Sequence, residues 1–461
     1  MLESSIDRVD FSSYDVIIAG AGAGGLLTAL GASALGKRCL VIESSDRLGG
    51  VWHGYWVNGF RVDQGLHMVT RVTRGSFVRF MRAYLDPPPE FVPHEGWFFY
   101  IDGRVGTIPS SIGQTLRWPL TGLRGRLGLA RVGAKIKTMR LDDMKRFKDI
   151  SFLDYMHRNG MYDQNVLDVI QSAVFMAAGV GIDRASAYET LRTLRDTDKE
   201  SSKIHSMKKL LFGIGVEYDE GVAIGGMSGL VDRVVSAISG DYVLNCSVER
   251  ISQGEDGTVD ITAGGVRFSH PTVVSNIPLW SMSKIVDSRS PAVAEFFERW
   301  GHMEPTMGLT VWLGLDDVVI GDRRSRVIVR PSPPRWIVSL SSFDPSCAPT
   351  GRELVAIATV LDTSKPVREQ VEALKGNGLT HLFPDLLDHV EMEHVQHSYA
   401  TRAALIPGQT DLDRPGPGTP IDGFYIVGTD TAGAGVGLQQ AANSAQGVLN
   451  VLCRKWRCQS D

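Results

Sequence analysis

The stretch from Tyr14 to Trp52 constrains the fold more than any other part of the chain. It contains an apolar run at Asp15–Ala19, glycines in the pattern GxGxxG, leucines at helical spacing and a second apolar run at Arg38–Ile42. This order predicts a strand, a glycine turn, a helix and a second strand. Such a unit is typical of a Rossmann-type domain, in which a helix N-terminus binds the pyrophosphate of a dinucleotide.

Each residue type in this pattern has a physical role. Gly20 allows a tight turn, Gly22 lets the backbone approach a pyrophosphate, and Gly25 lets helix and strand pack closely. Glu43 ends the second strand 18 residues after Gly25, where an acid accepts hydrogen bonds from ribose hydroxyls. An ordinary strand–helix turn is the competing interpretation, and the correctly placed acid argues against it. The predicted nucleotide contacts are Gly20, Ala21, Gly22, Ala23, Gly24, Gly25, Glu43 and Ser44.

Arg47-Leu48-Gly49-Gly50 follows the acid directly. It resembles the RxGG signature of the FAD-binding amine oxidase, phytoene desaturase and protoporphyrinogen oxidase superfamily, which plain nicotinamide dehydrogenases lack. The resemblance implies that the glycines let the chain pass the flavin end of FAD, and that the arginine helps to neutralise the pyrophosphate or carries the local turn. Many members carry Arg or Lys where this chain has Val51. The implied FAD contacts are Arg47, Gly49, Gly50, Val51 and Trp52.

The chain after this motif predicts a β-hairpin at Tyr55–Val62, turned at Asn58-Gly59, and a helix at Met68–Leu85. Between them, Asp63-Gln64-Gly65-Leu66-His67 resembles the D-x-G-x-H/S segment of the superfamily, which lies beside the isoalloxazine ring. The resemblance implies FAD contacts from Gly65, Leu66 and His67. His67 is the single catalytic candidate, and a hydrogen-bonded structural histidine is the competing interpretation.

Two later segments also resemble parts of the superfamily's FAD site. Val248 matches the position whose backbone meets the adenine. The segment Gly423–Leu449 resembles the closing motif, in which an acid bonds the ribityl or pyrophosphate region and a helix N-terminus faces the flavin. This chain has Gly428-Thr429-Asp430 where a glycine followed directly by an acid is commoner. The contacts implied here are Gly428, Asp430, Gly437 and Leu438.

The resemblance covers nearly all of the 461 residues and implies an α/β fold. We expect a Rossmann-type FAD-binding domain of the glutathione-reductase-like class of two-dinucleotide-binding-domain flavoproteins, with an inserted α+β substrate domain. The discontinuous FAD-binding domain is predicted at 1–80, 216–285 and 405–461. The substrate-binding domain is predicted at 81–215 and 286–404, with a helical subdomain near 110–210.

Composition excludes several classes of function. The net charge of −4 gives no general attraction to nucleic acid. Five cysteines, an odd number, argue against a disulfide framework and for a reducing compartment. No cysteine or histidine cluster has metal-ligand spacing, so no metal is predicted. The polar N-terminus is unlike a signal peptide, and no apolar run approaches the ~18–20 residues of a membrane span. We therefore expect a cytoplasmic protein.

The stretch 117–148 holds ten Lys and Arg but only two acids, Asp142 and Asp143. A basic amphipathic helix of this kind can lie on an anionic membrane, or can be a surface helix packed on its own core. The sequence leaves both interpretations open, and the first would make this stretch a peripheral membrane contact. The apolar face is predicted from Leu129, Val132, Ile136 and Met139.

The resemblance implies an FAD-dependent oxidoreductase, desaturase-like or dehydrogenase-like, that removes hydride from a hydrophobic small molecule such as an isoprenoid, a tetrapyrrole or another natural product. A flavin amine or amino-acid oxidase producing hydrogen peroxide is the first alternative, although the matching region His302–Gly308 lacks the lysine that such enzymes often carry. A non-redox isomerase using reduced FAD and a flavin-bound scaffold are further alternatives. No cysteine lies between Phe424 and Leu452, so FAD is expected to be non-covalent.

Overall fold

A parallel sheet of five strands forms the centre of one half of the molecule. The computed structural model describes residues 5–64, 68–195, 219–287, 289–398 and 402–458. The sheet has the order β10-β2-β1-β14-β20, and all its pairings are parallel. Its strands in that order are Gly240–Val243, Cys39–Ile42, Val16–Ala19, Val273–Ser275 and Phe424–Ile426. The two strands predicted around the glycine turn are therefore its central pair.

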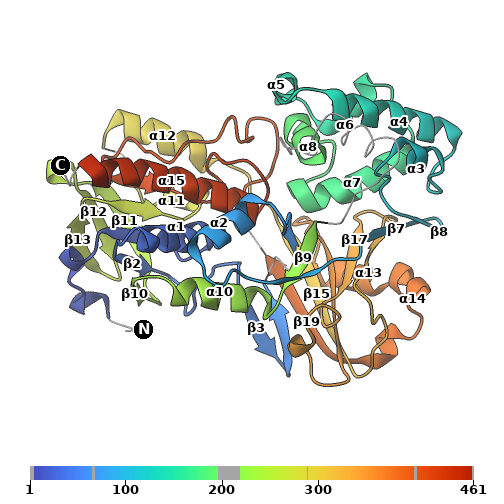
Figure 1. Ribbon diagram of the computed structural model, residues 1–461, viewed down its shortest axis with the longest axis horizontal. Helices are drawn as coiled ribbons and strands as arrows, with labels where there is room; N and C mark the ends of the chain where they lie inside the picture. The colour runs from blue at the N-terminus through green and yellow to red at the C-terminus, as the bar shows by residue number, and fades with distance from the viewer. Residues whose placement is uncertain (1–4, 65–67, 196–218, 288, 399–401, 459–461) are drawn as a thin grey trace.

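The two faces of the parallel sheet are covered differently (Figure 1). Because side chains alternate along a strand, Val16 and Ile18 face one side while Ile17 faces the other. Four helices cover the first side: α1 (Ala23–Ala34), α2 (Ser76–Tyr84), α10 (Gly226–Ser236) and α15 (Leu438–Cys458). The second side is covered by β11 (Val248–Gln253), β12 (Val259–Ala263), β13 (Val266–His270), α11 (Leu279–Met282) and α12 (Pro291–Gly301).

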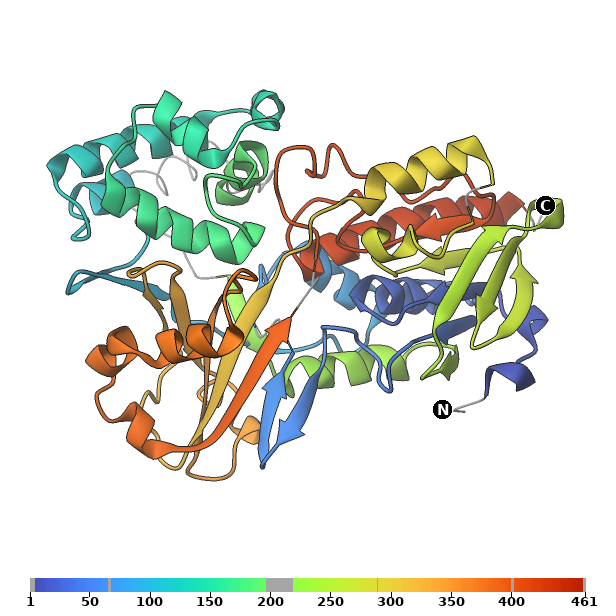
Figure 2. The same ribbon diagram turned by 180° about the vertical axis from the view of Figure 1, so that it is seen from behind.

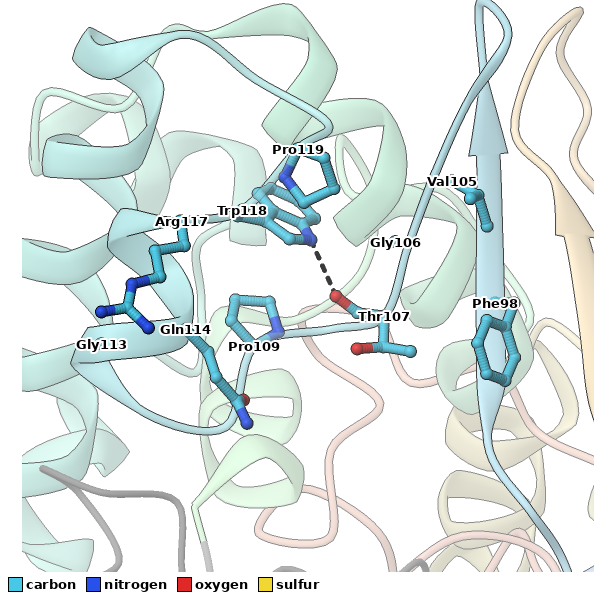
Figure 3. A pocket seen from close by; sticks show the side chains of 10 residues that line it. All are labelled: Phe98, Val105, Gly106, Thr107, Pro109, Gly113, Gln114, Arg117, Trp118 and Pro119. Atoms are coloured by element: carbon cyan, nitrogen blue, oxygen red, sulfur yellow. Dashed lines mark hydrogen bonds between the residues drawn. The ribbon is translucent and has the colours of Figure 1, made fainter.

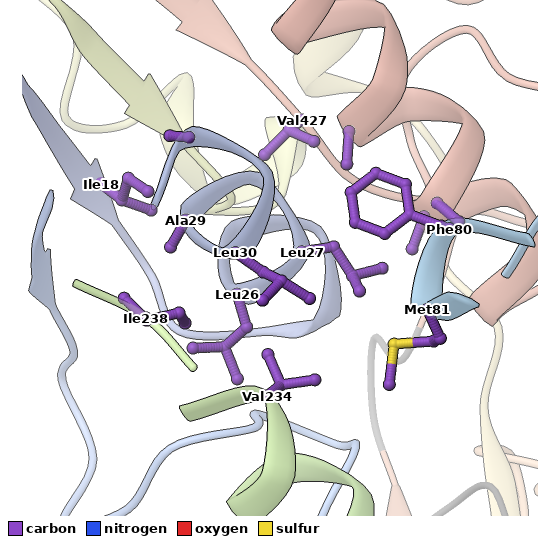
Figure 4. Packing of buried hydrophobic residues seen from close by; sticks show 14 of the residues in the cluster. Ile18, Leu26, Leu27, Ala29, Leu30, Phe80, Met81, Val234, Ile238 and Val427 are labelled. Carbon is purple, nitrogen blue, oxygen red and sulfur yellow. The ribbon is translucent and has the colours of Figure 1, made fainter. Parts of the chain in front are cut away.

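Helix α1 lies in the middle of the first layer (Figure 4). Its leucines at helical spacing are buried, with Leu26 and Leu30 at most 1% exposed. They belong to the same hydrophobic cluster as Val234 of α10 and Phe80 of α2. The periodicity read from the sequence is thus the face by which α1 packs on its neighbours.

A mixed sheet of seven strands forms the second half, in the order β19-β15-β18-β17-β16-β7-β8. Helices α13 (Val367–Lys375) and α14 (Asn377–Leu382) lie beside it (Figures 1 and 2), and α13 packs on it. The hairpin of β3 (Gly54–Val57) and β4 (Phe60–Asp63) packs against its residues Trp312 and Val338 through Phe60. The strands of the seven-stranded sheet, from β19 to β8 in the order given above, are Val390–Ser398, Gly308–Leu315, Glu353–Val360, Arg335–Ser339, Ser325–Ile328, Trp97–Ile101 and Arg104–Gly106.

A group of helices lies above the seven-stranded sheet in Figure 1, and all of them except α3 contribute to one hydrophobic cluster. We call this group the helical subdomain; its described helices lie within 110–210, where the sequence predicts such a subdomain. Its helices are α3 (Ile112–Leu116), α4 (Leu123–Thr138), α5 (Leu141–Met144), α6 (Phe152–Arg158), α7 (Gln164–Ala178) and α8 (Ala187–Leu194).

Two predicted assignments differ from the structure. The helix expected at Met68–Leu85 starts only at Ser76, because Val69–Thr70 (β5) pairs with β9 (Glu220–Ala223), which also pairs with β6 (Phe91–Pro93). Helix α12 falls in 286–404, which we expected to belong to the substrate domain. It packs instead on the second side of the parallel sheet, in one cluster with Ile17 and Phe424.

Helix α4 carries half of the basic stretch 117–148, and its predicted apolar face points inward. Val132, Ile136 and Met139 are at most 7% exposed and belong to the core of the helical subdomain, against which Leu129 also packs. That face is therefore not available to a membrane. Of the helices that the structure describes, none combines the length and the apolar character needed to cross a bilayer.

Candidate functional site

The glycine turn between β1 and α1 is closed so tightly that side chains would not fit. Gly20 has φ +95°, in the left-handed region that favours glycine. A Cβ on Gly25 would lie 2.2 Å from the carbonyl oxygen of Gly20. A Cβ on Gly22 would lie 2.4 Å from Oδ1 of Asn276. The backbone conformation of Gly20 and these two distances explain why all three positions are glycine.

The N-terminus of α1 is open to a ligand. The helix begins at Ala23, and its N-cap Gly22 supplies no side-chain hydrogen bond. The first bond within the helix runs from the N–H of Leu26 to the carbonyl of Gly22, at 3.0 Å. An N-terminus without a side-chain cap leaves N–H groups and a positive dipole end for an anion. This is the arrangement that a pyrophosphate requires.

Glu43 lies beneath this turn and is 8% exposed. Its Oε2 accepts a hydrogen bond from the N–H of Ala21 at 2.7 Å. Its Oε1 accepts from the N–H and the hydroxyl of Ser45, both at 2.9 Å, and from the hydroxyl of Ser44 at 3.2 Å. Each carboxylate oxygen offers about two acceptor positions. Because Oε2 accepts one hydrogen bond, from Ala21, it can accept one more donor. The ribose contact of Glu43 stays a prediction that this position supports.

The segment that leads into the strand of Val248 lies directly beside Glu43. The N–H of Cys246 donates to the carbonyl of Glu43, and that of Asn245 to the carbonyl of Ser45, both at 2.9 Å. Val248 then begins β11. The residue expected to meet the adenine and the residue expected to meet the ribose are thus neighbours in space.

The RxGG turn packs on the glycine turn. The N–H of Gly49 donates to the carbonyl of Ala21 at 2.9 Å, and Gly49 forms a parallel bridge with Gly22. Gly50 has φ +60°, and a Cβ there would lie 3.2 Å from the Cα of Gly22. The two motifs that the sequence separates by more than twenty residues therefore form one continuous glycine surface.

The other residues of the RxGG segment have different surroundings. Arg47 is about half exposed, and its guanidinium lies 5.4 Å from the centre of the Tyr55 ring. Val51 is exposed. Trp52 is 1% exposed and meets Phe77 of α2 edge-on, with ring centres 5.6 Å apart. The Trp52 side chain therefore packs the turn against α2, and its indole Nε1 is buried without a hydrogen-bond partner among the described residues. The FAD contact of Trp52 stays a prediction.

The closing motif lies beside the first glycine turn. A Cβ on Gly24 would lie 3.2 Å from the Cα of Gly428. The N–H of Gly428 donates to the hydroxyl of Ser444 on α15 at 3.1 Å. Gly437 has φ +57° and precedes Leu438, the first residue of α15. The predicted contacts Gly428, Gly437 and Leu438 thus belong to the same edge of the parallel sheet as Gly20–Gly25.

Asp430 is the shifted acid of this motif, and it is buried at 4% exposure. Its Oδ2 accepts a hydrogen bond from the N–H of Leu279 at 2.6 Å, which joins the motif to α11. Burial raises the pKa of Asp430 to about 6, and the nearby Arg414 opposes this. Arg414 also donates to the carbonyl of Thr429 at 2.7 Å. The structure therefore gives Asp430 a contact within the chain, and its contact with FAD stays a prediction.

Asn276 is a central residue of this site that the sequence analysis did not single out. It follows β14, and its Nδ2 donates to the carbonyl of Val427 at 2.9 Å. A Cβ on Gly22 or on Gly24 would meet the Asn276 amide within 2.8 Å. The superfamily pattern VV.A.P, which VVSNIP resembles, has alanine at this position. That departure was the available signal.

A second unforeseen group joins β3 to β19. The hydroxyl of Tyr55 lies 2.8 Å from Nε2 of His394 and 2.9 Å from Nε2 of Gln396. Burial lowers the pKa of His394. Next to it, His53 bonds the carbonyl of Gly50 through Nδ1, and its Nε2 is buried without a partner. Tyr55 and His394 are 339 positions apart in the chain, so no local pattern could reveal the group.

Three predicted residues, Gly65, Leu66 and the catalytic candidate His67, lie outside the described residues. Within the described ranges, no group of three or more His, Cys, Asp and Glu could hold a metal ion. The residues present do fit FAD: an uncapped helix N-terminus, a glycine surface too close for side chains, and a buried acid with spare acceptor capacity meet at one sheet edge.

Comparison with known proteins identifies similar chains. The model of the family described as flavin containing amine oxidoreductase matches residues 23–448. All-trans-retinol 13,14-reductase of Homo sapiens is 40% identical over 67 residues, which is 14% of this chain and 11% of that protein. The chain thus aligns with about a tenth of the length of the first curated relatives that it matches.

Two solved structures share the architecture across nearly the whole chain. An oxidoreductase from Methanosarcina mazei has a TM-score of 0.73 and 20% identity, and the match covers 95% of this chain and 99% of that one. A putative protoporphyrinogen oxidase from Exiguobacterium has a TM-score of 0.66 and 16% identity over 95% and 98% of the two chains. These likenesses confirm the predicted α/β fold with a Rossmann-type domain and an inserted domain.

Proposed function

Since this chain belongs to the family of flavin-containing amine oxidoreductases, we propose that it is an FAD-dependent dehydrogenase or desaturase of a hydrophobic small molecule. Membership confirms the predicted superfamily, the flavin cofactor and the oxidoreductase class. The direction of the reaction and the class of substrate are our proposal. FAD, when bound, supplies the acceptor of the substrate's hydride.

Different residues of the chain would bind different parts of this cofactor. The open N-terminus of α1, with Gly22 and Gly49–Gly50, would take the pyrophosphate, and Glu43 would take the ribose. The N-terminus of α15, after Gly437, would stabilise negative charge on the flavin end. The cofactor should be released intact by acid or heat, because no cysteine lies between Phe424 and Leu452.

The apolar wall beside the closing motif is the observation that carries the substrate class. Val436, which lies between the last two glycines of the motif, packs against the hydrophobic cluster of the helical subdomain. The half-buried Phe175 and Met176 of α7 pack against the same cluster. A substrate that reaches this end of the cofactor would meet apolar side chains. The retinol reductase named above supports a hydrophobic substrate by analogy only.

The chain offers less for the competing amine oxidase. The region His302–Gly308 contains no lysine, and β15 starts directly at its end. The isomerase alternative depends on His67, and the scaffold alternative would bind FAD through the same glycine motifs but without turnover. We further propose that the enzyme is cytoplasmic, that its ligands are FAD and a hydrophobic small molecule, and that it has no nucleic-acid partner.

Anaerobic reduction of the bound flavin tests this proposal. Purified holoprotein is mixed with isoprenoids, tetrapyrroles and, in parallel, primary amines and amino acids, and the flavin absorbance near 450 nm is followed. We expect bleaching by a hydrophobic substrate and none by the amines. Bleaching by amines with release of hydrogen peroxide in air would establish the oxidase instead. Turnover seen only after dithionite reduction would establish the isomerase.

A further inference from the structure

One end of the molecule combines exposed apolar side chains with a concentration of positive charge. It consists of the β7–β8 hairpin, α3 and the first turns of α4, which lie far from the parallel sheet (Figure 1). We call it the tip surface and define it by five exposed residues. They are Val105, Ile108, Leu116, Leu123 and Leu127, with exposed fractions of 46%, 45%, 41%, 66% and 53%.

The exposed leucines of α4 are not part of its buried face. Leu123 and Leu127 are one helical turn apart. Leu123 precedes the buried Val132 by nine positions, and Leu127 precedes the buried Ile136 by nine positions. Nine residues correspond to about 180° around a helix, so the leucines lie on the opposite side. Single exposed leucines are ordinary, but five apolar residues gathered at one end indicate a contact surface.

A pocket of about 450 Å³ opens between the hairpin and α3 (Figure 3). Its walls include Phe98, Val105, Pro109 and Trp118, and Arg117 also lines it. The indole N–H of Trp118 donates to the carbonyl of Thr107 at 2.7 Å. This indole nitrogen therefore needs no polar partner from a ligand in the pocket. The pocket therefore offers an apolar recess with a cation at its side.

The charge of this region is not balanced. From Gly103 to Leu141 the chain contains eight Lys and Arg and no Asp or Glu, whereas the whole chain has a net charge of −4. Arg104, Arg117 and Arg124 are exposed, and no ion pair involves them in the described part of the chain. Arg126 and Arg131 donate to backbone carbonyls rather than to carboxylates. The positive field of the region therefore faces solvent.

We propose that the tip surface docks on an anionic phospholipid bilayer. The leucines of α3 and α4 enter the interface, the arginines meet lipid phosphates, and the pocket takes part of an acyl chain. The excess positive charge favours an anionic partner. The exposed leucines favour a lipid bilayer over nucleic acid, because nucleic acid would attract the charge but would not bury the leucines. The contact uses the side of α4 opposite to the apolar face that the sequence predicted.

Flotation with liposomes tests the proposal on the FAD-loaded protein. We expect the wild type to float with phosphatidylglycerol vesicles at low salt and to be released from them at high salt. It should not bind phosphatidylcholine vesicles. Arg117→Glu combined with Arg124→Glu should lower the partition coefficient by at least about tenfold, because each basic residue near an anionic surface contributes to binding. Leu123→Ser combined with Leu127→Ser should lower it similarly at low salt.

Matched variants far from the tip surface serve as controls. Val318→Ser replaces an equally exposed apolar residue, and Arg368→Glu reverses an exposed charge on α13. Both should float like the wild type, and all variants should keep their FAD. Failure of the wild type to float at low salt overturns the proposal, as does flotation that the tip variants leave unchanged. A dimer in size-exclusion chromatography that the leucine variants dissociate would assign the surface to a second copy of the chain.

Discussion

Glu43 already accepts hydrogen bonds from four donors of its own chain, and we expect it to accept more from FAD. Glu43→Gln keeps the length of the side chain but removes its charge and one acceptor oxygen. FAD should bind about tenfold to a hundredfold more weakly, since a charge-assisted hydrogen bond is worth roughly 1.5–3 kcal/mol. Quenching of FAD fluorescence during titration of the apoprotein measures the change. An unchanged dissociation constant would reject the assignment.

Asn276 places an uncharged amide against the glycine turn, which is where the pyrophosphate is expected. Asn276→Asp keeps the shape but adds a negative charge beside two phosphates. We expect FAD affinity to fall by more than about tenfold, because like charges within a few ångströms repel strongly in a partly buried site. Asn276→Ala, which restores the superfamily residue, should cost less. Equal affinities for the Asp variant and the wild type would show that the amide lies away from the phosphates.

At the scale of single elements, α4 has two sides with opposite roles. Ile136 is buried at 7% exposure, while Leu127 is 53% exposed. Ile136→Ala should destabilise the helical subdomain by about 2–5 kcal/mol through lost burial and a cavity. Leu127→Ser should change stability by no more than about 0.5 kcal/mol. Chemical denaturation followed by circular dichroism compares them, and equal losses for the two variants would contradict this packing.

Elements whose contacts are local could be predicted from the sequence. The strand–turn–helix unit at 16–34 follows from apolar runs and glycines that act within a few residues of one another. The hairpin turned at Asn58-Gly59 does as well, since both residues adopt the positive φ that such a turn requires. Residues 69–70 could not be predicted as a strand, because their partner β9 lies about 150 positions away in the chain.

The candidate site shows the same division. The glycines and Glu43 could be predicted because their spacing along the chain is typical of a dinucleotide-binding motif. The hydrogen bonds of Tyr55 with His394 could not, since they depend on how β3 meets β19. Trp52 illustrates a third case: its position in the motif was recognised, but its side chain is directed by the packing partner Phe77.

At the scale of the whole molecule, Asp63 links the two halves. It ends β4, which packs on the seven-stranded sheet, and its Oδ1 accepts the N–H of Met227 on α10, at 3.2 Å. Burial raises its pKa to about 7, with Arg61 opposing the shift and Asp344 adding to it. A raised pKa in the folded state means that the unfolded chain releases its proton first. The stability from this group is therefore present below about pH 4 and is lost as pH rises to about 7.

Asp63→Asn removes this titration and keeps an oxygen for Met227. The variant should match the wild type near pH 3.5 and exceed its stability at pH 8 by a few kcal/mol, of order three pKa units at about 1.4 kcal/mol each. Melting temperatures of both proteins across this range measure the difference. Parallel pH profiles for the two proteins would show that Asp63 is ionised when folded.

The order of strands in the parallel sheet has a consequence for biosynthesis. Strand β20 and helix α15 come from residues 424–458, so the ribosome makes the other four strands of the parallel sheet before them. Until then β14 lacks its outer neighbour, and Gly428 cannot meet Gly24 and Asn276. If the closing motif contacts FAD as predicted, the FAD site is completed only after Phe424 has been made, and we expect a chain truncated before Phe424 to retain FAD poorly even where its other segments fold.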